Sequence, residues 1–279
     1  MIEKGSLFVC ATPIGNLRDV TLRVLDTLKQ VDFIAAEDTR HSRKLLNYYN
    51  IKTPLLSYHQ HNEKKRAAEI IARIKKGENC ALISDAGMPG ISDPGQILIN
   101  ECRQAGIEID VLPGPNAALT ALVLSGMPAD SFLFLGFLPG AKGKRQELLE
   151  KISTVSATII LYEAPHKLVR TLQDVLEVIG DRQAAVLREL TKVNQTVYKA
   201  PVSELLEKFQ AFPPKGECCL LLAPYEEEIE PGKPSDWLAE IGKLESEGIT
   251  CKEAMKTVAL KFGVSKREIY KAYINEKKR

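Results

Sequence analysis

Four short apolar runs in this chain each end in a turn rich in glycine and proline, and this repeat constrains the fold more than any other feature. The runs and their turns are 8–11 before 12–16, 80–83 before 84–95, 109–112 before 113–116, and 159–162 before 163–166. A strand that leads into such a turn is typical of a small-molecule site at the end of a sheet. Any one turn alone could serve only to reverse the chain. Four together predict one composite ligand cleft.

Two common phosphate-binding patterns are absent from the sequence. No GxGxxG follows the first apolar run, and GxxxxGK[ST] occurs nowhere. These glycine patterns let the backbone approach a phosphate group closely. Their absence argues against a Rossmann dinucleotide site and against a P-loop.

Apolar strands alternate with amphipathic helical patterns over the first half of the chain, which predicts an α/β architecture with a first domain over residues 1–113. A helix is expected to start at Asp93-Pro94, with the aspartate as its cap. Further strand patterns predict a second sheet in a domain over 114–228, at 132–135, 157–162, 184–187, 196–199 and 218–222.

An acidic, proline-bearing stretch at 226–234 is typical of a linker, and a small module over 233–279 follows it. Three short helices are expected in the module, at 237–247, 251–262 and 265–273. A Gly-Val-Ser turn separates the last two, which is the helix-turn-helix pattern. The module could bind RNA phosphates, or it could pack on the body or on a partner subunit.

Composition sets the broad class of the protein. Of the 279 residues 44% are hydrophobic, which is ample for ordinary cores, and no apolar run approaches the roughly 20 residues of a membrane helix. We therefore expect a cytoplasmic protein with no membrane partner. The six cysteines form no C-x-x-C pair and have no histidine at ligand spacing, so neither a disulfide nor a metal site is expected.

Six short segments, four of which contain the turns described above, match the pattern of a known family. The segments are ATPIGNL (11–17), AEDTR (36–40), SDAGMP (84–89), PGPNA (113–117), YEAPHK (162–167) and RELTK (188–192). Together they resemble the tetrapyrrole methylase superfamily of S-adenosylmethionine-dependent methyltransferases, over essentially the whole chain and in the expected order. The chain departs from the pattern at 193–195, where VNQ lacks an expected acidic residue.

The resemblance implies two α/β domains with mixed sheets, a homodimer, and methyl transfer from S-adenosylmethionine. Within the superfamily, the closest branch methylates a cytidine ribose 2′-hydroxyl in small-subunit (16S) ribosomal RNA, either naked or in the assembled subunit. Two alternatives stay open: a methylase of a small tetrapyrrole, and a non-catalytic RNA-binding or ribosome-assembly factor. The residues that the resemblance places at the cofactor are Pro13, Ile14, Asp85, Gly87, Met88, Asn116, Ala117, Tyr162 and Glu189.

A ribose hydroxyl is a weak nucleophile near neutral pH, so a positioned base, or a cation that stabilises the developing alkoxide, assists the reaction. Several polar residues in the matching segments could serve, namely Asp38, His41, Glu163, His166, Glu189 and Lys192. Glu163 is the preferred base or orienting group, because it follows a buried strand whose Tyr162 should border the cofactor. Asp38 and Lys192 are the other two catalytic candidates.

Local clusters of positive charge predict contacts with RNA, although the formal net charge is only +2. Loop 138–144 is small, polar and basic, as in a mobile flap over a polyanionic substrate. The predicted RNA contacts are Arg40, Arg43, Lys142, Lys144, Arg145, Arg188, Lys266 and Arg267.

Overall fold

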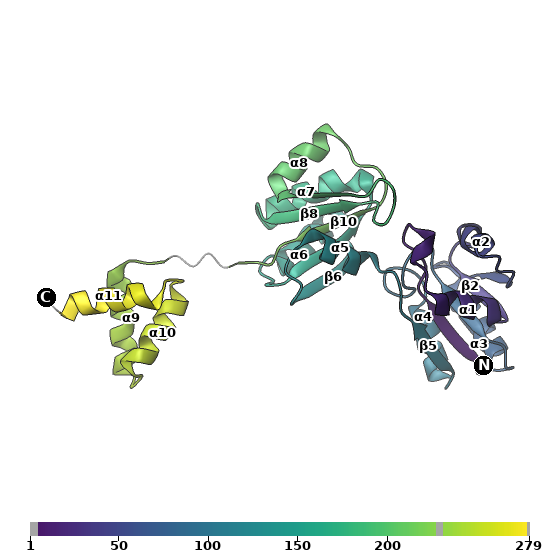
Figure 1. Cartoon of the computed structure of the whole chain (residues 1–279), viewed down its shortest axis with the longest axis horizontal. Helices are drawn as coiled ribbons and strands as arrows, with labels where there is room; N and C mark the ends of the chain where they lie inside the picture. The colour runs from purple at the N-terminus through teal and green to yellow at the C-terminus, as the bar shows by residue number, and fades with distance from the viewer. Residues whose placement is uncertain (1–4, 227–230, 278–279) are drawn as a thin grey trace. The chain divides into compact units, whose positions relative to one another are not determined.

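The computed structural model describes residues 5–226 and 231–277. It comprises two compact units, Met1–Tyr225 and Glu226–Arg279 (Figure 1). Both sheets belong to the first unit, so the expected domain boundary at residue 113 stays a prediction. The expected end of the second domain at residue 228 lies outside the described residues.

The first sheet is parallel throughout, in the order β3-β2-β4-β1-β5. The mixed sheet expected here is therefore wrong, because each strand returns through a crossover that keeps its direction. Strand β3 was not predicted, since it has three residues and is only half-buried. The strands are β1 (Ser6–Cys10), β2 (Phe33–Ala36), β3 (Leu55–Ser57), β4 (Cys80–Ile83) and β5 (Glu108–Leu112).

Helices cover both faces of this sheet. Phe8 and Cys10 of β1 pack in one core with Leu28 of α1, whereas Leu7 packs on the other side with Ile70 of α3. A strand buried on both faces is apolar along its whole length, as β1 is. The elements of this layer are η1 (Leu17–Asp19), α1 (Leu22–Gln30), α2 (Thr39–Tyr48), α3 (Glu63–Ile74) and α4 (Gln96–Gln104).

Helix α4 begins later than the sequence predicts. Its N-cap is Gly95, with φ of 146°, so Asp93 and Pro94 lie in the preceding loop. The expected cap at Asp93 is therefore wrong. The Asp93 side chain therefore belongs to the loop before α4 and does not cap the helix.

The predicted second sheet is confirmed, in the order β6-β7-β10-β8-β9. It is mixed, since β6 and β7 are parallel and the other pairs are antiparallel. Helices α6, α7 and α8 pack on one face and α5 on the other, where Ile14 joins the same core. The elements are α5 (Ala117–Ser125), β6 (Phe132–Phe137), α6 (Lys142–Ile152), β7 (Thr158–Glu163), α7 (Pro165–Val178), β8 (Gln183–Arg188), β9 (Thr196–Pro201), α8 (Val202–Ala211) and β10 (Cys218–Leu222).

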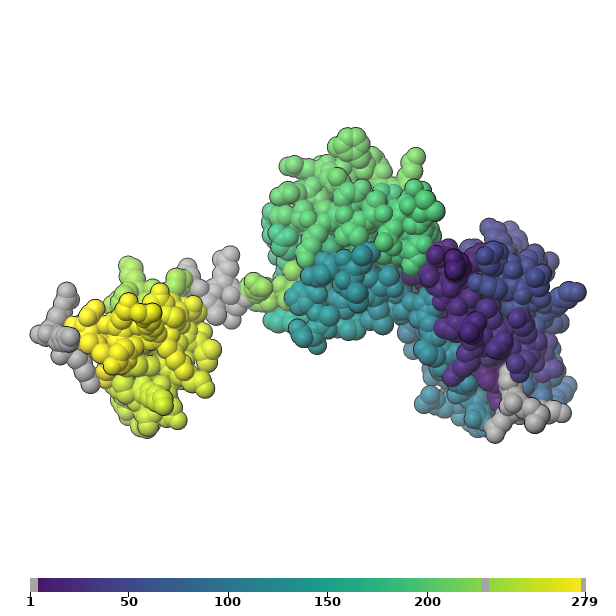
Figure 2. Space-filling model, in the orientation of Figure 1, coloured from purple at the N-terminus to yellow at the C-terminus, as the bar shows by residue number. Residues whose placement is uncertain are grey.

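The second unit is a three-helix module of α9 (Pro234–Ser246), α10 (Cys251–Lys261) and α11 (Lys266–Lys277), and its side chains pack closely in the space-filling view (Figure 2). Trp237, Val258 and Ile269 contribute to its core. Ser265 and Glu268 cap α11 reciprocally, since each backbone N–H donates to the other side chain, at 2.9 and 3.2 Å. The predicted helices, turn and serine cap are confirmed. Among the described residues, no helix is long and apolar enough to cross a membrane.

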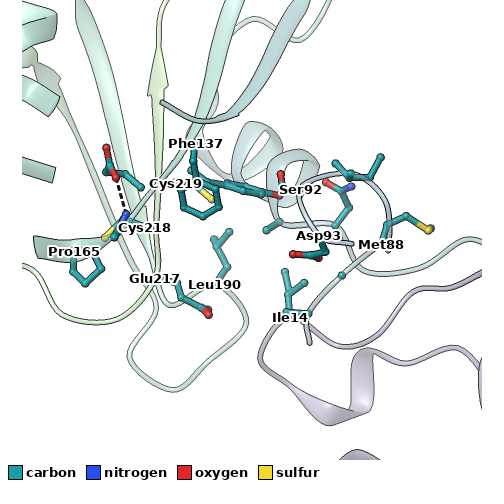
Figure 3. Close-up of a pocket in the computed structure, with 18 residues that line it drawn as sticks. Ile14, Met88, Ser92, Asp93, Phe137, Pro165, Leu190, Glu217, Cys218 and Cys219 are labelled. Atoms are coloured by element: carbon teal, nitrogen blue, oxygen red, sulfur yellow. Dashed lines mark hydrogen bonds between the residues drawn. The ribbon is translucent and has the colours of Figure 1, made fainter. Parts of the chain in front are cut away.

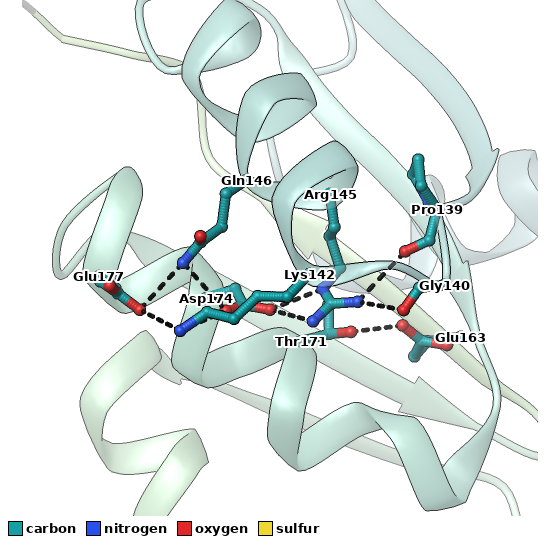
Figure 4. Close-up of polar contacts among 9 residues, drawn as sticks. All are labelled: Pro139, Gly140, Lys142, Arg145, Gln146, Glu163, Thr171, Asp174 and Glu177. Carbon is teal, nitrogen blue, oxygen red and sulfur yellow. Dashed lines mark hydrogen bonds and ion pairs between the residues drawn. The ribbon is translucent and has the colours of Figure 1, made fainter.

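A buried ion pair holds the loop that was expected to be a flap (Figure 4). Arg145, at the start of α6, is 1% exposed, and its Nη2 lies 2.5 Å from Oδ2 of Asp174 on α7. Its Nη1 donates to the carbonyl oxygens of Pro139 and Gly140, at 3.2 and 3.0 Å. The expected RNA contact through Arg145 is therefore wrong, because the guanidinium is engaged inside the fold.

We expect Arg145→Ala to lower the free energy of unfolding by about 3–5 kcal/mol, because Asp174 would keep a buried charge without its partner. Urea denaturation followed by circular dichroism measures this change. Lys142→Ala is the control, since the exposed Lys142 ammonium pairs with Glu177 at 3.3 Å and should contribute less than about 1 kcal/mol. Equal effects of the two variants would contradict the structural role of Arg145.

Candidate functional site

A pocket of about 320 Å³ lies where the loops at the ends of both sheets meet (Figure 3). All four predicted turns contribute to its walls, so the expected composite cleft is confirmed. Residues outside these turns complete the lining, among them Phe137, Leu190 and the stretch 217–219. The residues from the turns and from the strand before the fourth are Ile14, Ala86, Gly87, Met88, Ile91, Ser92, Asp93, Asn116, Ala117, Tyr162, Glu163, Ala164 and Pro165.

Backbone hydrogen bonds join the first two loops. The Thr12 N–H donates to the carbonyl of Gly87 at 2.9 Å, and the Gly87 N–H donates to that of Thr12 at 3.0 Å. The Thr12 hydroxyl also donates to the carbonyl of Ser84 at 3.0 Å. Gly87 has φ of 82°, a conformation that glycine adopts without strain. This bridge fixes the neighbouring Ile14 and Met88 in the pocket wall.

The third and fourth loops meet at Tyr162. Its hydroxyl accepts a hydrogen bond from the Ala118 N–H at 3.2 Å, while Asn116 caps the same helix by accepting from the Leu119 N–H at 3.0 Å. The ring of Phe137 lies edge-on to Tyr162, with centroids 5.7 Å apart. Burial raises the pKa of Tyr162 to about 12, so its hydroxyl stays protonated near neutral pH.

A strained loop after β8 reaches across to the first loop. Glu189 and Thr191 have φ angles of 53° and 63°, a backbone conformation that residues other than glycine rarely adopt. The Thr191 hydroxyl accepts from the Asn16 N–H at 2.9 Å. Gly15 leaves room for this contact, because a Cβ there would lie 2.7 Å from the carbonyl oxygen of Leu190. Such backbone strain is common at functional sites.

The residues predicted to hold the cofactor fall into two groups. Three of them do not line the pocket but are next in sequence to a residue that does: Pro13, Asp85 and Glu189. The Glu189 carboxylate accepts hydrogen bonds from the Lys192 ammonium and from the Glu217 N–H. Their contacts with a cofactor stay predictions. Those that line the pocket are Ile14, Gly87, Met88, Asn116, Ala117 and Tyr162.

The preferred base, Glu163, points away from the pocket. Its carboxylate accepts from the Thr171 hydroxyl at 2.5 Å and from the Ala164 N–H at 2.9 Å (Figure 4). Because neighbours in a strand face opposite sides of the sheet, Glu163 lies on the α7 face while Tyr162 faces the pocket. Glu163 contributes to the lining but its carboxylate is held by Thr171, and its preferred role as base or orienting group stays a prediction.

The other two catalytic candidates have ionic partners. Asp38 caps α2, and hydrogen bonds from Arg40 hold the pKa of its carboxyl at about 2. Such a carboxylate is a weak base. Lys192 instead bridges the carboxylates of Glu189 and Glu217, at 3.1 and 2.9 Å. Burial alone would lower the pKa of Lys192, but these hydrogen bonds raise it, so the ammonium stays charged.

The predicted RNA contacts other than Arg145 are exposed or partly exposed. Arg40 and Arg43 line a second hollow of about 360 Å³ along α2. Lys142 and Lys144 begin α6, and Arg188 donates to the carbonyl of Lys215. In the module, Lys266 and Arg267 are exposed at the start of α11. Their contacts with RNA stay predictions.

Three acidic residues were not assigned to the site from the sequence. Asp93 points into the pocket, and Glu217 lines it (Figure 3). Glu37 follows β2. Burial first, and then the charges of Asp93 and Asp85, raise the pKa of its carboxyl to about 7. The acidic character of the 84–95 turn was a usable signal for Asp93. No motif marks Glu217.

Comparison with known proteins identifies relatives of this chain. Residues 6–206 match the family model described as Tetrapyrrole (Corrin/Porphyrin) Methylases. The "Ribosomal RNA small subunit methyltransferase I" of Halalkalibacterium halodurans is 43% identical, over 98% of this chain and 96% of that protein. The protein of the same name from Escherichia coli O157:H7 is 42% identical, over 96% and 94%. The module lies outside the matched family residues.

Solved structures share the fold at low sequence identity. A uroporphyrin-III-C-methyltransferase from Thermus thermophilus aligns with a TM-score of 0.57 and 21% identity, over 79% of this chain and 94% of that one. A diphthine synthase aligns with a TM-score of 0.62 and 12% identity, over 78% and 89%. At these identities the likeness establishes the fold alone.

We expect Gly15→Ala to destabilise the first unit by roughly 1–3 kcal/mol, because the new Cβ would meet Leu190 and Thr191 at 2.7 Å. Urea denaturation measures the change. The control is Gly143→Ala in α6, where a Cβ meets nothing within 4 Å, so this variant should be neutral or stabilised. Similar stability of the two variants would argue against the close approach at Gly15.

Proposed function

The chain belongs to the tetrapyrrole methylase family, and from this premise we propose that it transfers a methyl group from S-adenosylmethionine to a cytidine ribose 2′-hydroxyl in small-subunit (16S) ribosomal RNA. The observation that carries this proposal is 42–43% identity to relatives named for small-subunit ribosomal RNA, over almost the whole of both chains. The shared fold supports methyl transfer and leaves the acceptor open.

The pocket suits S-adenosylmethionine, which supplies an electrophilic methyl group on a sulfonium. Its volume of about 320 Å³ is within the range of roughly 300–1,000 Å³ typical of small-molecule sites. Ile14, Met88 and Tyr162 offer apolar and aromatic walls, which suit an adenine ring. The loop backbones at Gly87 and Ala117 bring polar groups to the same cavity, which suits the ribose and amino acid portions.

Activation of the acceptor hydroxyl is best assigned to Lys192. Its ammonium is charged, partly buried, and held beside the pocket by Glu217, which lines it. A cation fixed there stabilises negative charge that develops on the hydroxyl oxygen. Asp38 and Glu163 are weaker candidates, because Arg40 neutralises the first and the second is turned toward Thr171.

A polyanionic acceptor fits the cations around the pocket and in the module. Arg40 and Arg43 provide planar donors suited to phosphate oxygens. Lys266 and Arg267 at the start of α11 could add phosphate contacts, and we propose that the module helps to hold the RNA. The substrate is either naked RNA or the assembled small subunit, and the labelling experiment distinguishes the two.

The reaction is tested by incubating the purified chain with methyl-labelled S-adenosylmethionine and either small subunits or naked ribosomal RNA. We expect label on one cytidine 2′-oxygen, which nuclease digestion and mass analysis locate. Label on an added tetrapyrrole instead of RNA would contradict the proposed acceptor. Cofactor binding without any transfer would support a non-catalytic role.

Replacing Lys192 tests its role in catalysis. We expect Lys192→Met to lower kcat by about 100-fold, because the methionine keeps the apolar stem and loses the charge. The Kd for S-adenosylmethionine should change little, as measured by calorimetry. Lys208→Met on α8 is the matched control and should keep kcat. A change confined to KM would assign Lys192 to substrate binding only.

We also propose that the chain forms a homodimer through α5. This helix contains no charged residue, and while Ala121 and Leu122 are buried, Leu119 and Val123 on the opposite side are 48% and 81% exposed. A helix that is apolar on all sides is usually covered on all sides. A second copy of this chain offers the same apolar surface, as a two-fold interface requires.

We expect Val123→Lys to convert the dimer into a monomer, because the new ammonium would be buried at the interface. Light scattering coupled to size exclusion measures the mass. Phe212→Lys replaces another exposed apolar side chain, beyond the end of α8, and should leave the dimer intact. A monomeric parent chain at micromolar concentration would overturn the proposal.

A further inference from the structure

The charged residues that line the pocket are all acidic. They are Asp93, Glu163 and Glu217, and among the described residues of the lining none is lysine or arginine. Two of the carboxylates have partners, since Glu163 accepts from Thr171 and Glu217 pairs with Lys192. Among the described residues, Glu217 is therefore the only one of the three that is paired with a cation.

Like Glu163, Asp93 has no cationic partner, but its carboxylate is not turned toward Thr171. No ion pair among residues 5–226 and 231–277 includes it. Its carboxylate points into the cavity, close to Ile14 (Figure 3). Burial raises its pKa, a hydrogen bond with the Ser84 side chain opposes this rise, and the charge of Asp85 adds to it. A carboxylate in such surroundings interacts strongly with any cation that enters.

A second carboxyl, Glu37, is close enough for the charge of Asp93 to affect it. Glu37 follows β2, the neighbour of β4 in the sheet, and its carboxylate accepts a hydrogen bond from the Asp85 backbone. The other ionisable groups around the two are Asp38 at the start of α2, Asp85 after β4, and Tyr162 on β7. None of these is a cation. Glu37 and Asp93 therefore each oppose ionisation of the other.

We propose that Asp93, together with Glu37 after the neighbouring strand, distinguishes the cationic methyl donor from its neutral product by charge. This inference rests on the cofactor part of the proposed function and not on the RNA acceptor. During transfer the bond from sulfur to the methyl carbon breaks, a carbon–oxygen bond forms, and the proton of the acceptor hydroxyl passes to solvent water. Sulfur keeps the electron pair and becomes a neutral thioether. The attraction to Asp93 disappears at that step, which favours release of the product S-adenosylhomocysteine.

The carboxyl pair also makes donor binding depend on pH. A cation in the pocket favours the ionised forms of Glu37 and Asp93, so donor binding releases protons. Donor affinity therefore rises as pH increases through the pKa of Glu37 near 7. The neutral thioether has no sulfonium charge to favour ionisation. Its affinity should change less between pH 6 and pH 8.

Titration calorimetry on the full-length chain tests the proposal with S-adenosylmethionine and S-adenosylhomocysteine as the two ligands. We expect Asp93→Asn to weaken donor binding by about tenfold or more and to change product binding by less than about twofold. Asp130→Asn is the matched control, because it makes the same change at an exposed carboxylate that does not line the pocket. The ratio of the two Kd values should stay near that of the parent chain.

The second variant, Glu37→Gln, tests the carboxyl pair. We expect it to flatten the pH dependence of the Kd ratio between pH 6 and pH 8. If Asp93→Asn weakened the binding of both ligands equally, or left the ratio of their Kd values unchanged, the proposal would be overturned and Asp93 would have a structural role. A parent chain that binds neither ligand would overturn this inference together with the proposed cofactor. If the chain discriminated between the two ligands by charge but did not methylate RNA, this inference would hold and the proposed RNA acceptor would be wrong.

Discussion

The carboxyl ends of β1 and β4 lie side by side in a parallel sheet, and two hydrogen bonds between Thr12 and Gly87 extend their pairing into the loops beyond. Without that bridge, two glycine- and proline-containing loops would be free to separate. With it, Ile14 and Met88 occupy fixed positions in one wall. Ile14 also packs in the core beneath α5, so the same bridge helps to join the two sheets around the pocket.

Charge is distributed in opposite ways inside and around the pocket. The charged side chains of its lining are acidic, whereas exposed arginines and lysines lie along α2 and at the start of α6. An acidic interior favours a cationic donor, and an exposed cationic surface favours a polyanion. The charge of Lys192 is balanced by two carboxylates, of which Glu217 lines the pocket. The two substrates of the proposed reaction thus meet electrostatic surroundings of opposite sign.

The sequence predicts the cleft well because its turns follow buried strands, and strand periodicity and glycine-proline turns are local signals. It predicts the direction of side chains poorly. Glu163 was preferred for its place beside Tyr162, yet adjacent residues in a strand face opposite sides, and Glu163 pairs with Thr171. Arg145 lies in a basic run, and only the fold brings it to Asp174, distant in the sequence. Burial of a charge depends on such long-range partners.

Helix α5 connects the pocket to the proposed interface between copies. Its first turn contributes Asn116 and Ala117 to the pocket and receives the Tyr162 hydroxyl, while its outer side exposes Leu119 and Val123. Asn116 and Leu119 are further linked by the capping hydrogen bond at 3.0 Å. A contact that orders the outer side would therefore also order the first turn. Formation of the dimer and organisation of the cofactor site would depend on the same short helix.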